Sequence, residues 1–269
     1  MIREAVVAGA FYPGDKDSLK QMLGDFINQE ETKVKALGIV SPHAGYIYSG
    51  KTAGKVFSKI EIPDKVIILG PNHRGIGSDF ALYAKDAWET PLGKVLINTE
   101  LAEKLLASSK YLQEDETAHQ MEHSLEVQVP FLQYLNPKVT IVPIIIGGMG
   151  YRLDSLLEIG ESIGKVIAEE KDDVLIVASS DMTHYESKEA ALKKDKWAID
   201  EILNLEEEKL FKVVRDKHIT MCGVLPTIVM LKAVKSLSPK DTFLVEYTNS
   251  GEVSGDFSEV VGYAGIVIS

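Results

Sequence analysis

Short apolar runs rich in β-branched residues recur along the chain and predict strands that are buried on both faces. A typical run is KVIILG at residues 65–70, which has no polar side chain after its first position. Each run is too short for a buried helix and has the length of an ordinary strand. The predicted strands are residues 36–40, 65–70, 140–146, 173–179, 242–247 and 263–269.

Helices are predicted between these runs, because apolar positions recur there with the spacing of one helical face. The clearest pattern begins at Leu19 and continues to Ile27, and a second begins at Leu153 and continues to Ile167. Further helices are expected at 188–203, 206–216 and 223–236.

The alternation of strands and helices predicts the fold class. It is typical of an α/β fold with three layers, α/β/α, around a mostly parallel or mixed central sheet. No linker, repeat or low-complexity segment interrupts the pattern, so we expect a single domain over residues 1–269. Residues 79–93 depart from the alternation and are expected to add a hairpin or an antiparallel edge.

Composition and charge exclude several kinds of partner. Of the 269 residues 45% are hydrophobic, and 40 Asp and Glu against 29 Lys and Arg give a formal charge of -11. No Lys and Arg cluster could follow a phosphate backbone, so nucleic acid is not an expected partner. No run of about 18 apolar residues occurs, so we expect no membrane partner and a cytoplasmic location. The single cysteine, Cys222, excludes an internal disulfide and fits a reducing compartment.

Histidines follow three of the predicted strands. His43 comes after 36–40, His73 after 65–70 and His184 after 173–179. Loops at the carboxyl ends of strands converge over an α/β sheet, so these side chains are expected to meet in one cleft. A histidine in such a place is, taken alone, more often an ordinary loop residue than a ligand. Three in equivalent places favour a functional site.

Cys222 is the candidate that completes a metal site. It stands just ahead of the predicted helix at 223–236, where the helix macrodipole favours the thiolate that binds metals. A buried apolar thiol is the competing interpretation. With His43 and His73 it would leave open positions on the metal, which is typical of a catalytic site. Sulfur favours Fe(II), copper or zinc over magnesium or calcium.

Other residues are expected to complete the cleft around this metal. His184 is a candidate general acid or base, with Asp181 orienting its ring. Asn249 follows the predicted strand at 242–247 and offers hydrogen bonds to the same cleft, and Tyr46 is expected to line it.

The stretch AHQMEHSLEV at 118–127 offers a competing metal site, because His119 and His123 stand four residues apart with Glu122 between them. On one helix both histidines would share a face, and H-x-x-E-H is the inverted form of a zinc-peptidase motif. The evidence for a helix over this stretch is weak, because Pro130 follows closely and apolar and polar residues around Val127 alternate as in a strand.

A second interpretation of this stretch is therefore preferred. We expect His123 to line the cleft beside the metal, with Glu122 or Glu126 supporting the same site through hydrogen bonds. His119 is expected to face solvent.

Motifs along nearly the whole chain resemble those of the Memo family, of the AmmeMemoRadiSam system protein B type. The resemblance implies a fold related to the class III extradiol dioxygenases, whose non-haem iron lies in a cleft at the strand ends. It also implies that His43, His73 and Cys222 hold the metal and that His184 matches the acid–base histidine of those dioxygenases. The motifs are AGAFYPGD, SPHAGYIYSG (41–50), GPNH (70–73), MEHSLEVQVPFL (121–132), SSDMTHY (179–185), MCG (221–223) and YTNSG (247–251).

The chain departs from the dioxygenases at one ligand, because Cys222 stands where they have a carboxylate. The resemblance therefore implies redox or oxygen-related chemistry at a mononuclear non-haem site, with Fe(II) or copper expected first and zinc as the alternative, rather than ring cleavage itself. It also implies operon partners of radical SAM and AMMECR type.

Two functions remain open at this point. The chain is either a metal-dependent oxidoreductase acting on a small molecule, or a non-enzymatic module that binds a peptide or protein in the former dioxygenase cleft.

Overall fold

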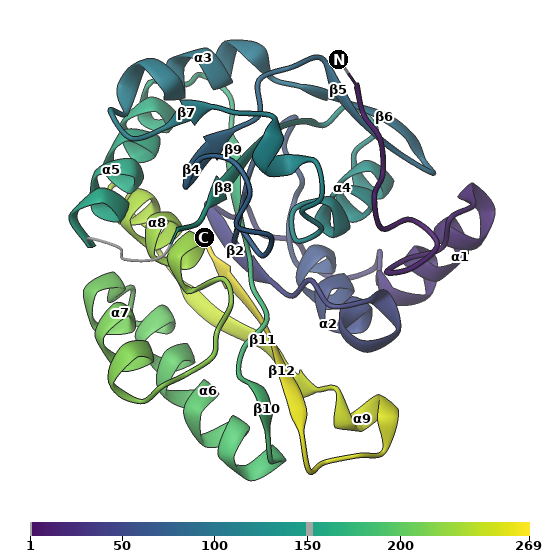
Figure 1. Ribbon diagram of the computed structural model, residues 1–269. Coiled ribbons are helices and arrows are strands. Elements are labelled where there is room, and N and C mark those ends of the chain that lie inside the picture. The colour runs from purple at the N-terminus through teal and green to yellow at the C-terminus, as the bar shows by residue number, and fades with distance from the viewer. Residues whose placement is uncertain (1, 149–152) are drawn as a thin grey trace.

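A mixed β-sheet forms the centre of the fold in the computed structural model, which describes residues 2–148 and 153–269 (Figure 1). The four central strands are parallel and lie side by side in the order β8, β3, β9, β2. Their bounds are Thr140–Ile146 for β8, Lys65–Gly70 for β3, Val174–Ser179 for β9 and Gly38–Ser41 for β2.

Antiparallel strands extend the sheet on the β2 side. β12 (Val260–Ile268) pairs with β2, and β12 in turn pairs with β11 (Thr242–Asn249) and the short β10 (His184–Glu186). On the β8 side, the further strands are β6 (Gly93–Ile97), β5 (Ala87–Thr90), β1 (Ile2–Arg3), β4 (Phe80–Leu82) and β7 (Gln113–Glu114).

Helices cover both faces of this sheet (Figure 1). One face carries α3 (Thr99–Ser108), α5 (Leu153–Glu169), α6 (Lys188–Leu203), α7 (Glu207–Asp216) and α8 (Val224–Lys235). The other face carries α1 (Lys16–Phe26), α2 (Tyr46–Ser58) and α4 (Val129–Leu135). Three shorter helical segments complete the described chain: the 3-10 helices Thr117–His119 and Glu126–Gln128, and α9 (Gly251–Ser254).

Strand β3 shows why the apolar runs of the sequence have no polar alternation. Ile67 and Leu69 point into the core under α5 and α8, whereas Val66 and Ile68 point into the core under α2 and α4. Successive side chains of a strand face opposite sides, so a sheet covered on both faces needs apolar residues at every position.

The predicted α/β class, with a large, mixed and mostly parallel sheet, is confirmed. The six predicted strands and the helices expected at 188–203, 206–216 and 223–236 are all present, with bounds that differ by at most a few residues. Residues 79–93 also behave as predicted, because β5 and β6 form an antiparallel hairpin and β4 pairs antiparallel with β8.

Helix α2 is an element that the hydrophobic pattern does not reveal. Its buried face carries mainly small residues, among them Gly50 and Gly54, so it lacks the stripe of large apolar side chains that marks a helix. A Cβ on Gly54 would lie 2.5 Å from the carbonyl oxygen of Phe26, the last residue of α1. Glycine is therefore what lets α1 and α2 lie this close together.

No helix in the described ranges, 2–148 and 153–269, is long and apolar enough to cross a bilayer. This finding agrees with the absence of a long apolar run in the sequence.

Candidate metal centre

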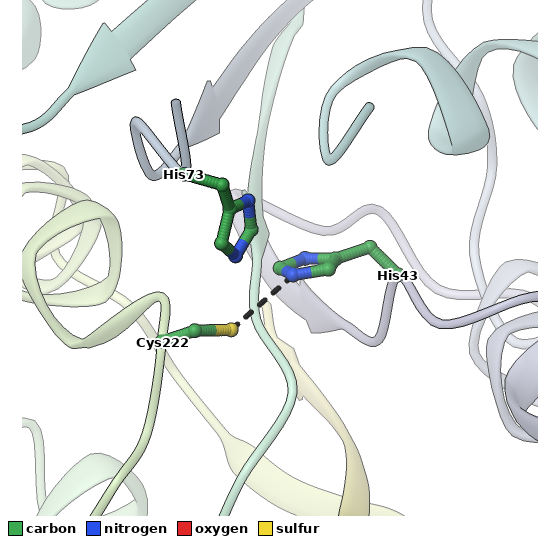
Figure 2. Close-up of side chains that lie close together, drawn as sticks. All are labelled: His43, His73 and Cys222. Carbon is green, nitrogen blue, oxygen red and sulfur yellow. Dashed lines mark hydrogen bonds between the residues drawn. The ribbon is translucent and has the colours of Figure 1, made fainter. Parts of the chain in front are cut away.

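The loops that follow β2, β3 and β9 bring the strand-end residues together. These strands are neighbours in the sheet and run in the same direction, so the segments after them leave from one edge. His43 comes from the loop after β2 and His73 from the loop after β3, while Cys222 comes from the loop just before α8. Figure 2 shows the three side chains pointing toward one another.

The distances among these three side chains suit a single metal ion. One donor atom from each of His43, His73 and Cys222 lies within 4.8 Å of the other two, and His43 Nε2 is 3.2 Å from the Cys222 sulfur. In a tetrahedral site with bonds of about 2.0–2.3 Å, the ligand atoms lie roughly 3.5 Å apart. The donor set is therefore close to a binding geometry before any ion is added.

A serine fixes which nitrogen of His43 is available. The Ser179 hydroxyl donates to the carbonyl of Ser124 at 2.6 Å, so its oxygen can only accept from other partners. It accepts from the amide of Gln128 at 2.8 Å, and it lies 3.0 Å from His43 Nδ1. His43 must then carry its proton on Nδ1, which leaves the Nε2 lone pair facing Cys222.

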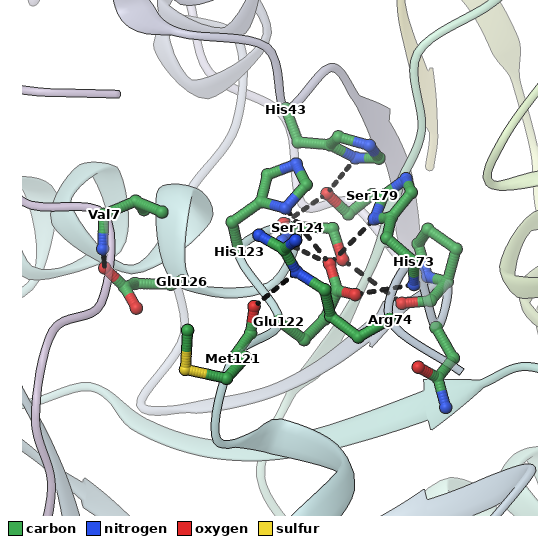
Figure 3. Close-up of polar contacts among 12 residues, drawn as sticks. Val7, His43, His73, Arg74, Met121, Glu122, His123, Ser124, Glu126 and Ser179 are labelled. Atoms are coloured by element: carbon green, nitrogen blue, oxygen red, sulfur yellow. Dashed lines mark hydrogen bonds and ion pairs between the residues drawn. The ribbon is translucent and has the colours of Figure 1, made fainter. Parts of the chain in front are cut away.

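A carboxylate does the same for His73. Glu122 Oε1 lies 2.8 Å from His73 Nδ1, and Glu122 Oε2 accepts from the backbone N–H of His73 at 2.7 Å (Figure 3). Burial alone would raise the pKa of Glu122, but hydrogen bonds from His73 and from the backbone of Ser124 lower it to about 2. The ionised carboxylate accepts the Nδ1 proton, so His73 also offers Nε2 to a metal.

Cys222 differs from the expectation of a thiolate at a helix end. Burial, and then the nearby Asp181 carboxylate, raise the pKa of the thiol well above its usual value, and these effects exceed the hydrogen bonds that lower it. Without a cation the S–H group is favoured and donates to His43 Nε2. A metal that binds here has to displace that proton.

Asp181 occupies a different place from the one predicted. Its Oδ1 accepts the backbone N–H of His43 at 2.8 Å, and its own N–H donates to the Cys222 sulfur at 3.3 Å. Burial raises the pKa of this carboxyl to about 6. The ring of His184 is instead oriented by Thr220, whose carbonyl oxygen lies 3.0 Å from His184 Nδ1. The prediction that Asp181 orients His184 through a hydrogen bond is therefore wrong.

His123 lies beside both candidate histidine ligands. Its ring stacks on His73 with a centroid distance of 4.7 Å, lies edge-on to His43 at 5.5 Å and contacts Phe11 at 4.7 Å. Burial lowers its pKa to about 4, more than the neighbouring Glu122 raises it. His123 is therefore a neutral imidazole in the wall of the site at physiological pH.

Two residues expected in the cleft lie elsewhere. The ring of Tyr46 is buried in the core against Tyr12 and Phe131, and its hydroxyl donates to the carbonyl of Val127. As the first residue of α2, Tyr46 points back into the helical layer rather than toward the histidines. Asn249 lines a separate depression beside α9.

The pair His119 and His123 does not form a metal site. The two histidines do not share a helix, because the 3-10 helix that contains His119 ends there and the chain then turns. His119 is fully buried rather than solvent-facing, and its Nε2 donates to the carbonyl of Ala81. The strand-like interpretation around Val127 is also wrong, because Val127 lies in the 3-10 helix Glu126–Gln128. Pro130 follows in the first turn of α4, where its missing N–H costs nothing.

An arginine near the N-terminus, which no sequence motif marks, holds this stretch in place. The Arg3 guanidinium donates to the carbonyls of His119 (2.7 Å) and Glu122 (2.8 Å) and to the Glu126 carboxylate (2.7 Å). Glu126 in turn accepts the backbone N–H of Val7 at 3.0 Å (Figure 3). Glu126 therefore fixes the N-terminal segment, while Glu122 is the carboxylate that supports the candidate metal site.

The fold and the convergence of two imidazoles and a thiol define an α/β protein with a candidate His-His-Cys metal centre. A family model described as "Memo-like protein" matches residues 3–267. A "MEMO1 family protein" of Aquifex aeolicus is 46% identical over 268 residues, covering 99% of this chain and 98% of that protein. Another, from Nitrosopumilus maritimus, is 42% identical over 278 residues and covers 99% of each chain. The chain therefore belongs to the Memo family.

A solved structure supports the fold alone. An uncharacterized protein of Escherichia coli K12 is similar with a TM-score of 0.56 and 11% sequence identity, covering 87% of this chain and 100% of that one.

The burial of His119 predicts a loss of stability in acid. Burial lowers its pKa to about 3, whereas the unfolded chain has the ordinary value of 6.5, so only the unfolded state gains a proton at mildly acidic pH. The stabilisation is complete above pH 6.5 and is lost as the pH falls from there toward 3. Between pH 7.5 and 5, we expect the free energy of unfolding to drop by about 2 kcal/mol from this group.

Urea unfolding at several pH values measures this drop. His119→Gln places an amide N–H near the position of Nε2, where it can still donate to Ala81 but cannot titrate, so this variant should show a flatter dependence on pH than the wild type. An unchanged slope would show that His119 is not the group responsible.

Ser179 generates a second prediction. Ser179→Ala removes the acceptor of the His43 Nδ1 proton and should weaken metal affinity about 10- to 100-fold, because such hydrogen bonds orient a histidine ligand. Competition with a chromophoric chelator measures the affinity. Ser162→Ala is the control, since Ser162 is buried in α5 and its hydroxyl donates to the carbonyl of Ser108 rather than to any part of the candidate site. Equal metal affinity in the Ser179 and Ser162 variants would contradict the assigned role.

Proposed function

We propose that this Memo-family protein holds one transition-metal ion through His43 Nε2, His73 Nε2 and the Cys222 sulfur, and uses it in redox or oxygen-related chemistry on a small molecule. The observation that carries the proposal is the arrangement of protons around the two histidines. Ser179 and Glu122 occupy both Nδ1 positions, so both Nε2 lone pairs are left for the space beside Cys222.

The chemistry of the donor set supports a redox-active ion. Two imidazoles and one thiolate suit Fe(II) or copper, with zinc as the alternative, and three protein ligands leave room for a substrate at the metal. When bound, such an ion supplies a Lewis acid and, for iron or copper, a one-electron couple.

His184 is the residue proposed to move a proton. The carbonyl of Thr220 can only accept, so His184 carries a proton on Nδ1 and its Nε2 is left to take a proton from a bound molecule or to return one. Its ring is partly exposed at the end of the 180–184 segment, where a substrate can reach it.

Metal content is the first test. Wild-type protein purified without air should contain about one metal ion per chain by elemental analysis, and His43→Ala and Cys222→Ser should contain far less, because each loses one of three ligands. His218→Asn is the matched control, since His218 lies outside the cluster and asparagine tolerates its left-handed backbone (φ 50°). Unchanged content in both ligand variants would refute the proposal.

Turnover is the second test, and it separates an enzyme from a binding module. Oxygen uptake by metal-loaded protein is measured with a panel of catechols and other small reductants. His184→Gln should keep its metal but lose about 10²- to 10⁴-fold in rate, the usual contribution of a general acid or base. If no member of the panel is turned over while peptide binding is retained, the non-enzymatic alternative is favoured instead.

A further inference from the structure

A pocket of about 480 Å³ adjoins the metal centre, and two of the proposed ligands, His73 and Cys222, form part of its wall. This volume is in the range of pockets that hold small molecules. Any compound bound here lies directly beside the proposed metal, so the walls of this pocket determine which substrate the site can take.

Most of the wall is apolar. Helices α7 and α8 contribute Phe211, Val214, Val224 and Leu225, and the end of β8 contributes Ile146. The buried parts of these side chains belong to the core beneath the pocket, so the surface is backed by packed residues and holds its shape. A ligand that covers this surface gains free energy in proportion to the apolar area removed from water.

Among the residues that the structure describes, Arg215 is the one Lys, Arg, Asp or Glu on the wall, and it is a cation. Arg215, in the last turn of α7, lines the pocket, and its guanidinium also contacts the neighbouring Asp216. Asp216 uses only the Nε and Nη2 groups of the arginine, and a pair this exposed contributes little binding energy. Arg215 can therefore still donate to an anion in the pocket.

Two carboxylates among the described residues near the pocket disfavour an anion with more than one negative charge. Asp79 lies close to the pocket as well as Asp216. A Cβ atom added to Gly148, which lines the pocket, would be 2.3 Å from the carboxylate carbon of Asp79. The chain as a whole carries a formal charge of -11. Within the described ranges, this balance of one arginine against two aspartates suits a carboxylate better than a dianion such as a phosphate monoester.

We propose that this pocket binds a small organic acid, with its apolar body against the walls from α7 and α8 and its carboxylate at Arg215. The proposal deepens the proposed function by naming the substrate class of the same site. This proposal rests on the proposed function only for the part that the metal plays in the reaction. Binding of the acid itself does not need the metal, because the pocket is formed by the protein alone.

Binding of simple probes to metal-free, full-length protein tests the proposal independently of the metal. Butyrate, hexanoate and octanoate are titrated by calorimetry beside hexanamide and hexylammonium. Hexanoate should bind about two- to fivefold more tightly than hexanamide, the range expected for one partly exposed ion pair, and hexylammonium should bind most weakly. Each added methylene that is buried should tighten binding up to about fourfold until the pocket is full.

Arg215→Gln should remove the preference for hexanoate over hexanamide while leaving the dependence on chain length. Lys217→Gln is the matched control, because Lys217 lies over the Trp197 ring and does not line the pocket. Increasing the salt concentration should reduce the preference in the wild type, since screening weakens an exposed ion pair.

Equal affinity of the wild type for hexanoate and hexanamide would overturn the proposal, as would an unchanged preference in Arg215→Gln or the absence of binding by every probe. A failure of the metal hypothesis would appear separately, as unchanged metal content in the His43 and Cys222 variants.

Discussion

The candidate site depends on the parallel register of three neighbouring strands. Leu69 of β3 and Val40 of β2 both pair with Ala178 of β9, so the three strands end almost level with one another. Their loops consequently leave the sheet at one edge, which is where parallel α/β sheets place ligands. Residues that are more than a hundred positions apart in the chain, such as His43 and Ser179, can therefore be hydrogen-bonded partners.

The site also depends on which ring nitrogen of each histidine carries the proton. The hydroxyl of Ser179 and the carboxylate of Glu122 each use one nitrogen of a histidine and leave the other for the centre. Glu122 is itself held by the N-terminal segment, because Arg3 donates to its backbone carbonyl. The support of the site thus extends from the sheet edge to the first residues of the chain. Such supporting hydrogen bonds are a regular part of metal centres.

The electrostatics of the cluster fit a role for a cation. Burial favours the neutral thiol of Cys222, raises the pKa of the Asp181 carboxyl and lowers that of His123. Uncompensated charge is costly in such a place, and a bound metal ion is the natural counter-charge for a thiolate. The same site opens onto a pocket whose wall is mostly apolar, so a cation held by His43, His73 and Cys222 would lie beside an apolar surface.

The sequence by itself determined the central strands of the sheet, because apolar runs such as 65–70 and 140–146 indicate burial on both faces. It also pointed to His43, His73 and Cys222, because they follow strands or precede a helix. It did not reveal α2, whose buried face has small residues. Only the tertiary structure showed that Asp181 bonds to His43 rather than orienting His184, and that Tyr46 faces the core. The physical reason is that periodicity records which face of an element is buried, whereas hydrogen-bond partners are set by contacts between segments distant in the chain.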